Sequence, residues 1–353
     1  IALFDKEEFP REKVCGDAVT AYVPQVLETI DSKLAYKLNN TFTDREVIKH
    51  VLVSSPANKS IKISFKRSSF ISKREVFDNW LLNQVKETKA AECFMGTRIE
   101  KHEFNGKDHT IHSGNRKWKA PLLIGADGAN SIVQKMVRPA CHSLKHNMAA
   151  VRGYFHGISG MQENTFEFHF LKDYMPGYLW IFPLPDGYAN VGFGLVSNLV
   201  KQKKLSLRKL LPQILHEHSL FASRFRNAKR VSEIKGFGLP LGSRKLPLSS
   251  NGTMLCGDAA NLIDPATGEG IGQAMVSGRY AGWMAKECFE ENRFDSRFLK
   301  SYDHQVYQKL WRENYSRYII QRTLRRAPWM LDFAIEFGNK SPWFKRKIEG
   351  ITW

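Results

Sequence analysis

The segment 256–278 combines two features that suit an anionic ligand rich in hydroxyl groups. Asp258 follows a short apolar run at 253–257 that predicts a strand, and the glycines within 268–272 precede a long stretch with helical spacing. An aspartate at a strand end can accept hydrogen bonds from hydroxyl groups. The start of a helix presents unpaired N–H groups and the positive end of the helix dipole to negative charge. The alternative interpretation is that the glycines only allow close helix packing.

Two other aspartates also stand where a predicted strand ends. The apolar run 121–124 leads directly into Gly125-Ala-Asp-Gly-Ala-Asn-Ser, and a buried strand that enters a glycine turn is a common ligand-binding position in α/β folds. The opening run 1–4 ends at Asp5 and predicts a short buried strand. Dinucleotide-binding folds place an acid there to hydrogen-bond the adenosine ribose, although an acidic residue that merely leaves a strand is equally common.

These segments resemble motifs of one superfamily of FAD-dependent proteins, the p-hydroxybenzoate hydroxylase-like superfamily. Residues 256–278 resemble its GD motif over most of their length, and residues 125–131 are similar to its DG motif. Residues 72–78, Ser-Lys-Arg-Glu-Val-Phe-Asp, look like its R-x-x-F-D helix start, although an arginine at a helix start is often only solvated. One departure is Gln134, where an arginine usually stands.

The resemblance implies that the cofactor is FAD, bound without a covalent bond. Asp258 would contact its ribityl or pyrophosphate part, residues 268–272 would face the isoalloxazine ring, and the helix start would stabilise negative charge on the reduced ring. Arg74 would lie near the pyrophosphate, and Asp127 would help to hold FAD. The predicted cofactor-binding residues are Asp5, Arg74, Asp127, Gly128, Gly257, Asp258, Pro265, Gly268, Gly270, Ile271 and Gly272.

A Rossmann-like fold carries a glycine fingerprint, G-x-G-x-x-G, before the acid at Asp5, and the sequence has no such fingerprint there. The glycines at 268–272 follow a different strand and cannot replace it. We therefore expect that about 30 residues, comprising the first strand, the phosphate loop and its helix, are missing from this chain. The missing N–H groups would cradle the pyrophosphate, so FAD binding by the chain alone is expected to be weak.

Two further segments resemble the geranylgeranyl reductase family. The first is Arg11-Glu-Lys-Val-Cys-Gly-Asp17, and the second, 177–194, contains the pattern Tyr-x-Trp-x-Phe-Pro at 178–183. In that family a cysteine-glycine turn lies beside the flavin, and a Y-x-W-x-F-P strand lines the lipid cavity. The predicted catalytic residues, all as parts of the cavity lining, are Cys15, Tyr178 and Trp180.

Strand geometry bears on the aromatic segment independently of the resemblance. Because side chains alternate along a strand, Tyr178, Trp180 and Phe182 would share one face and form a flat apolar wall against a polyene chain or a flavin ring. The alternative is an ordinary aromatic strand in a β core. Cys15 would tune the flavin or position the substrate, whereas a single cysteine is more often a small buried residue.

The resemblance implies an FAD-dependent oxidoreductase that reduces C=C bonds of geranylgeranyl chains, on an isoprenoid diphosphate or a membrane lipid, by hydride transfer from the reduced flavin. NADPH is a candidate reductant. The alternative is an FAD-dependent monooxygenase or halogenase that acts on an aromatic or polyketide-like small molecule, because the same fold supports both chemistries. The Tyr-x-Trp-x-Phe-Pro pattern matches the halogenase W-x-W-x-I-P only in part.

Composition bounds the setting of this chemistry. At 353 residues and 42% hydrophobic content, the chain can bury one large core or two connected ones, and it has no run of about 20 apolar residues. Its five scattered cysteines show no metal-ligand spacing, so we expect no metal site and a cytoplasmic location. The net charge of +18 favours an anionic partner, although a lysine-rich proteome has the same effect. We expect an apolar substrate and no specific nucleic acid. For the basic aromatic C-terminal region two interpretations stay open, a peripheral contact with membrane lipid or a solvated helix that packs its aromatic side chains on the core.

The elements that must position the site follow from hydrophobic period. Residues 47–70 predict two strands before a helix that begins at Arg74, and short alternating strands near 91–118 predict a meander. We therefore expect an α/β fold, α+β overall, with a Rossmann-like FAD-binding domain and an inserted antiparallel β-sheet domain for the substrate. The expected bounds are 1–147 and 246–300 for the FAD-binding domain, 148–245 for the substrate domain, and 301–353 for a basic helical region.

Overall fold

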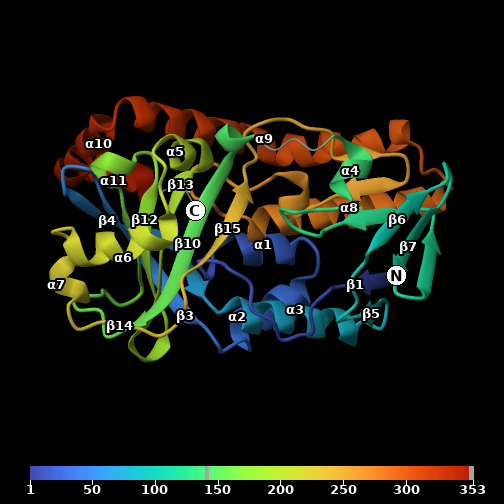
Figure 1. The fold of residues 1–353 in the computed structure, drawn as a ribbon, viewed down its shortest axis with the longest axis horizontal. Coiled ribbons are helices and arrows are strands. Elements are labelled where there is room, and N and C mark those ends of the chain that lie inside the picture. Colours follow the sequence, from blue (N-terminus) through green and yellow to red (C-terminus); the bar gives the residue numbers. More distant parts are fainter. Residues whose placement is uncertain (140–142, 350–353) are drawn as a thin grey trace.

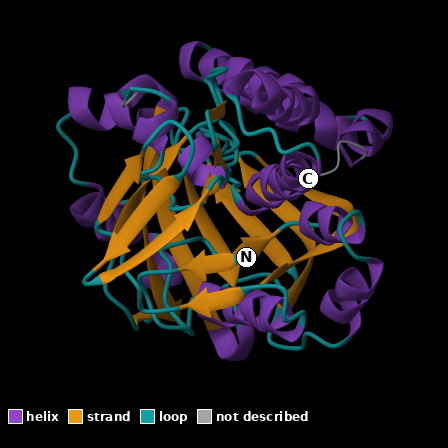
Figure 2. Cartoon of the chain, turned by 90° about the vertical axis from the view of Figure 1, so that its right-hand side faces the viewer, coloured by secondary structure: helices purple, strands orange, loops and turns teal. Residues whose placement is uncertain are grey.

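The computed structural model describes residues 1–139 and 143–349, so that Cys141 lies outside the described part. Its largest element is a mixed nine-stranded sheet, which fills the left half of Figure 1 and the centre of Figure 2. The order across this sheet is β14 (Lys229–Arg230), β10 (Asn147–His156), β13 (Tyr188–Val196), β12 (Tyr178–Pro183), β11 (Thr165–His169), β3 (Glu46–Ser54), β4 (Ser60–Ile71) and β2 (Ala18–Val19), with β15 (Lys235–Pro240) also pairing with β10.

Two parts of the chain that lie far apart in sequence share this sheet. The strands within 147–240 pair antiparallel with one another, which confirms the predicted antiparallel sheet. β11 then pairs in parallel with β3, with Phe168 beside Val53, so residues 18–71 continue the same sheet. The sheet therefore crosses the predicted boundary at 147, and the division into domains stays a prediction.

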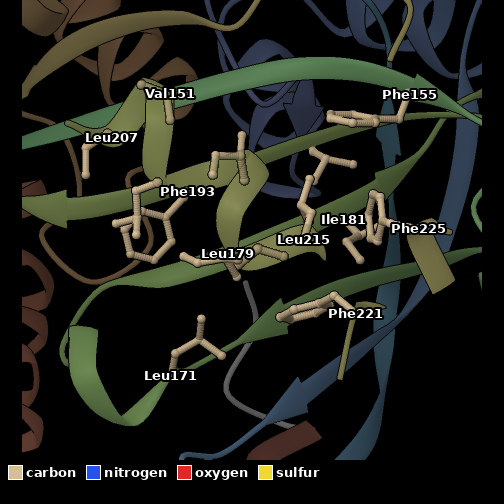
Figure 3. Packing of buried hydrophobic residues seen from close by; sticks show 14 of the residues in the cluster. Val151, Phe155, Leu171, Leu179, Ile181, Phe193, Leu207, Leu215, Phe221 and Phe225 are labelled. Atoms are coloured by element: carbon tan, nitrogen blue, oxygen red, sulfur yellow. The ribbon is translucent and has the colours of Figure 1, made fainter. Parts of the chain in front are cut away.

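Three short helices cover one face of the sheet, namely α5 (Ser197–Gln202), α6 (Leu207–Glu217) and α7 (Ala222–Phe225). Figure 3 shows this packing, with Leu215 and Phe225 beside Ile181 of the sheet. Because side chains alternate along a strand, the neighbours of Ile181 on β12 point to the opposite face. The side chains that α6 buries have the spacing of one helical face and are Leu207, Leu210, Leu211, Ile214 and Leu215.

The other half of the molecule contains three small sheets. β1 (Ala2–Phe4) pairs in parallel with β5 (Glu92–Phe94), and β17 (Thr253–Leu255) pairs in parallel with β9 (Leu123–Gly125) and antiparallel with β16 (Ser249–Ser250). The third sheet is the predicted meander of β6 (Lys101–Phe104), β7 (His109–Ser113) and β8 (Arg116–Ala120). The helices of this half are α1 (Tyr22–Glu28), α2 (Ser32–Asn40), α3 (Arg74–Glu87), α4 (Gln134–Val137) and α8 (Ile271–Glu290). Short 3₁₀ turns occur at Leu144–His146, Lys172–Tyr174, Pro185–Gly187 and Gly257–Ala260.

Two strands are less buried than the sequence predicts. The two strands within 46–71, the helix at Arg74 and the long helix after the glycines at 268–272 are confirmed. The predicted buried strand β1, however, has Leu3 38% exposed, and in β9 Ile124 is 41% exposed. Within the described residues each of these strands is paired along one edge only, so its other edge leaves apolar side chains in contact with solvent.

The region after 295 is helical, as predicted. It forms α9 (Ser296–Arg326), α10 (Trp329–Lys340) and α11 (Pro342–Glu349), and α9 and α10 run along one long side of the molecule (Figure 1). α9 packs beside α8, while α10 and α11 pack on β4. In the part of the chain that the structure describes, no helix is both long and apolar enough to cross a membrane.

Candidate functional site

A cavity of about 430 Å³ lies between the large sheet and the other half of the molecule. The lining comes from the loop before β2, the face of the sheet opposite α6, the helix α3, the segment after β17, and the turn before α8 with the first residues of α8. Its size is within the range of small-molecule sites. The residues predicted from the sequence that meet in this lining are Cys15, Arg74, Tyr178, Trp180, Asp258, Gly268, Gly270 and Ile271.

The sheet side of the cavity is an aromatic wall. Tyr178, Trp180 and Phe182 all line it from β12, so they share one face as the strand period requires. The ring of Phe166 lies 4.6 Å from that of Phe182, and the ring of Phe168 lies 5.3 Å from that of Tyr178. Apolar side chains that extend this wall are Val51, Phe65, Met148, Phe237 and Leu239.

A glycine lets the Trp180 ring lie flat against the neighbouring strand. A Cβ added to Gly192 would overlap both the Trp180 ring and the backbone oxygen of Val151. Gly192 stands directly opposite Trp180 in the pairing of β12 with β13. The missing side chain therefore makes room for the indole of Trp180, which lines the cavity.

Beside the aromatic wall, on the same face of the sheet, a buried polar network joins the sheet to the loop that carries Cys15. Asn190 is completely buried, and its side-chain oxygen accepts a hydrogen bond of 2.9 Å from the indole nitrogen of Trp180. Its nitrogen donates to the backbone oxygen of Cys15 and to the carboxylate of Asp17, both at 2.8 Å. The hydroxyl group of Tyr154 donates to the same carboxylate at 2.6 Å. This network was not predicted from the sequence. The one feature that could have indicated it is the polar residue Asn190 inside an otherwise apolar strand.

Burial controls the protonation of this network. It raises the pKa of Asp17, although the hydrogen bonds from Tyr154 and Asn190 and the charge of Arg152 oppose that shift. Burial and the nearby Asp17 also raise the pKa of Tyr154 far above its ordinary value, so the phenol keeps its proton. Tyr154 therefore acts as a fixed donor that holds Asp17 and, through Asp17, the Cys15 loop.

A chain of ion pairs runs from the end of β1 to the cavity. Arg74 holds Asp78 with two hydrogen bonds, of 2.7 and 2.9 Å. Arg11 donates hydrogen bonds to Asp78 at 3.2 Å and to Asp5 at 3.3 Å. It therefore connects the aspartate at the end of β1 with the aspartate of the R-x-x-F-D segment. Burial lowers the pKa of Arg74, but Cys15 and Asp78 together raise it above the ordinary value. Arg74 is therefore a permanent positive charge in the cavity wall.

The glycine turn before α8 fits the role of a cradle for a flat ligand. Gly268 has a positive φ of 73°, and a Cβ there would lie 3.1 Å from the hydroxyl group of Tyr178. A Cβ on Gly272 would lie 2.5 Å from the ring of Tyr22. α8 starts after Gly270 without a side-chain cap, so its first N–H groups are available to a ligand. A narrow turn that leads into an uncapped helix start suits the polar edge of an isoalloxazine ring.

Six predicted cofactor residues do not belong to the cavity lining in the described structure. Asp127 accepts hydrogen bonds from the backbone of Ile132 and Val133, so it caps the turn before α4. Gly257 has a positive φ of 56° and packs against α8, since a Cβ there would lie 2.9 Å from Ala274. Their role in cofactor binding stays a prediction. The six residues are Asp5, Asp127, Gly128, Gly257, Pro265 and Gly272.

Glu269 lines the cavity but was not predicted from the sequence. It stands between Gly268 and Gly270, which were both predicted. Its side-chain oxygen accepts a hydrogen bond of 2.6 Å from the hydroxyl group of Thr20. The pKa of Glu269 is raised to about 7, mainly by burial. The hydrogen bond from Thr20 and the charge of Arg317 lower it, but by less than burial raises it. A carboxyl group of this kind can exchange a proton at neutral pH.

The fold is shared with solved structures that include a reductase-like protein and flavin-dependent halogenases. A geranylgeranyl bacteriochlorophyll reductase-like protein from Thermoplasma acidophilum superposes with a TM-score of 0.81 at 21% identity, over 94% of this chain and 83% of that one. Halogenase PltM in complex with phloroglucinol and FAD superposes with a TM-score of 0.74 at 12% identity, over 99% of this chain and 81% of that one. These identities show a shared fold.

Sequence comparison then identifies the branch. Residues 148–236 match the model of the geranylgeranyl reductase catalytic domain. Digeranylgeranylglycerophospholipid reductase 2 of Methanopyrus kandleri is 27% identical over 283 residues, which are 76% of this chain and 67% of that protein. The corresponding reductase of Thermoplasma volcanium is 29% identical over 207 residues, which are 58% of this chain and 51% of that protein. The chain thus spans about half to two thirds of these relatives, and its resemblance to the geranylgeranyl reductase family is confirmed.

Proposed function

We propose that the protein reduces C=C bonds of geranylgeranyl chains, carried by a glycerophospholipid or a diphosphate, with FAD as cofactor. One observation supports this most strongly: an aromatic wall and an uncapped, glycine-rich helix start face the same cavity. The wall suits an apolar chain, and the helix start suits the polar edge of a flavin. The relatives named for digeranylgeranylglycerophospholipids supply the substrate class.

FAD, when bound, supplies a hydride from its reduced ring. Arg74 would balance charge on the pyrophosphate side, and Asp258 would accept hydrogen bonds from the ribityl hydroxyl groups. The turn around Gly268 would contact the ring, since it lines the cavity and Gly268 has no side chain to hold the ring away. These roles rest on the placement of the three residues in one cavity.

The protein itself contributes orientation and the exclusion of water. Tyr178 donates a hydrogen bond to the backbone oxygen of Thr267, which fixes the wall against the glycine turn. Trp180 is fixed by Asn190 and Gly192. A rigid apolar slot of this kind holds an alkene against the reacting atom and keeps water away from it. NADPH is the proposed source of the electrons.

We also propose that α10 lies on a membrane surface while the protein works. Its inner face, with Leu331 and Ile335, packs into the apolar cluster that includes the cavity wall. Its outer face exposes Trp329, Phe333 and Phe337. Exposed basic side chains flank this face, and aromatic rings beside arginine and lysine favour anionic lipid. The exposed basic side chains are Arg322, Arg325, Arg326, Lys340 and Arg346, and the half-buried Lys345 lies among them in sequence.

The test of function uses the FAD-loaded protein, reduced without oxygen and mixed with geranylgeranyl diphosphate or with a digeranylgeranylglycerophospholipid. We expect mass spectrometry to show products that have gained hydrogen in pairs. The alternative activity, a monooxygenase or halogenase, predicts an unchanged lipid. It also predicts oxygen or halide in an aromatic test compound once air and halide are admitted, and that outcome would replace the proposal.

A further inference from the structure

Glu269 differs from the other acids of the cavity. Asp78 and Asp258 each pair with an arginine or a lysine, whereas Glu269 has no basic group at ion-pair distance in the described residues. Its hydrogen-bond donor is instead the neutral hydroxyl group of Thr20, at 2.6 Å. A carboxylate in this place would be partly buried without a counter-ion, so the neutral carboxyl group is favoured.

Two nearby negative charges act on the pKa of Glu269 in the same direction as its burial. Burial is the main cause that raises its pKa to about 7, and the negative charges of Asp264 and Glu313 add to the shift. The hydrogen bond from Thr20 and the charge of Arg317 lower the pKa. Arg317 is bound to Asp264 in an ion pair, so the opposite effects of these two charges on Glu269 partly offset each other and burial remains the main cause. Glu269 therefore holds a proton near neutral pH and can also release it.

We propose that Glu269 is the proton donor that completes reduction of the C=C bond, an inference that rests on the function proposed above. The alkene gains two electrons and two hydrogens in this reaction. A hydride from the reduced flavin forms one C–H bond, and the proton of the Glu269 carboxyl group forms the other. The flavin is oxidised and the alkene reduced, and the carboxylate left on Glu269 takes a proton back from water.

Position supports this role over that of the phenols in and near the cavity. Glu269 stands between Gly268 and Gly270, at the helix start predicted to face the isoalloxazine ring, and it lines the cavity. The hydroxyl group of Tyr178 is already engaged with a backbone oxygen, and burial raises its pKa far above the ordinary value. Burial also raises the pKa of Tyr22 to about 12. An efficient proton donor has a pKa near the working pH, and Glu269 meets that condition.

The first test compares the wild type with Glu269→Gln, which keeps the size of the side chain and an acceptor for Thr20. Each protein is loaded with FAD, reduced, and mixed with geranylgeranyl diphosphate in a single turnover. We expect the variant to reduce the alkene about 10²- to 10⁴-fold more slowly. The wild-type rate should fall as the pH rises through about 7, and the variant should lack this dependence.

The second test needs neither FAD nor substrate. Infrared spectra of the wild type should contain the C=O band of a protonated carboxyl group that disappears as the pH rises through about 7. The band should be missing in Glu269→Gln and present in Glu287→Gln, which removes an exposed carboxylate from α8. If Glu269→Gln changes neither the band nor the rate and its pH dependence, Glu269 is not the donor.

Failure of the two proposals can be told apart. A wild-type protein that reduces no geranylgeranyl substrate, yet shows the carboxyl band, contradicts the proposed function. If the wild type and Glu269→Gln reduce the substrate at the same rate, Glu269 is not the proton donor. If Glu269→Gln loses FAD, Glu269→Asp decides, because a slower rate with a shifted pH profile supports proton donation and an unchanged profile rejects it.

Discussion

The indole nitrogen of Trp180 donates a 2.9 Å hydrogen bond to the side-chain oxygen of Asn190, and this bond ties the cavity wall to the loop of Cys15. Asn190→Leu would leave the indole, the Cys15 carbonyl and the Asp17 carboxylate each short of a partner. We expect the free energy of unfolding to fall by about 2–4 kcal/mol, because buried polar groups without partners are costly. Chemical denaturation measures this change.

The matched control is Asn39→Leu, at an exposed position on α2. It should change the free energy of unfolding by no more than about 0.5 kcal/mol. Equal stability of Asn190→Leu and the control would show that the network contributes nothing to the fold.

Gly192→Ala tests the close contact beneath Trp180. The added methyl group would overlap the indole ring and a backbone oxygen, so the ring must move into the cavity. We expect a loss of about 1–3 kcal/mol in the free energy of unfolding and a shift of the tryptophan fluorescence. Gly278→Ala is the control, since no atom lies within 4 Å of its added Cβ in α8. There the change should stabilise the helix by up to about 1 kcal/mol, and a similar loss in both variants would refute the contact.

The regular elements were predictable because their periods are local. The strands at 46–71 and 178–196 and the helix at 74–87 follow from alternation and helical spacing of apolar residues. The parallel pairing of β11 with β3 was not predictable, since it joins segments more than a hundred residues apart and no short pattern records such a partner. The exposure of Leu3 was missed for a related reason, because apolar composition does not reveal how many neighbours a strand has.

Site residues could be predicted only where they belong to a sequence motif or to the alternating pattern of a strand. The positions of Tyr178, Trp180 and the glycine turn follow from alternation and from glycine spacing. Asn190 and Asp17 belong to a network that exists only once β12, β13 and the Cys15 loop meet in space. Likewise the raised pKa of Glu269 comes from enclosure by distant segments, and no local pattern encodes enclosure.

Acid stability should depend on Glu167. Arg224 holds its carboxylate with hydrogen bonds of 2.6 and 2.8 Å, and His169 adds another of 2.9 Å. Burial raises the pKa of Glu167, but these partners together hold it below its ordinary value of 4.5. The stabilisation is therefore present above pH 4.5 and is lost as the pH falls through the lower folded value.

We expect Glu167→Gln to lower the free energy of unfolding by about 3–5 kcal/mol at pH 7, because it leaves Arg224 without its counter-ion. The deficit relative to the wild type should shrink as the pH falls below 4.5. Denaturation at a series of pH values measures both. Glu103→Gln, at an exposed ion pair, should leave the melting temperature unchanged at every pH, and a pH-independent deficit in Glu167→Gln would contradict the ion-pair account.

The outer face of α10 should determine binding to lipid. Trp329 and Phe333 are 65% and 64% exposed on the helix whose inner face packs into the cluster of the cavity wall, so their rings are free to enter a membrane interface. We expect the wild type to sediment with anionic vesicles at low salt and the double variant Trp329→Ser and Phe333→Ser to stay in the supernatant. Phe289→Ser removes an equally exposed ring from α8 and should sediment like the wild type. If all three proteins sediment alike, charge alone attracts the protein to lipid, and if none sediments, α10 serves a different partner.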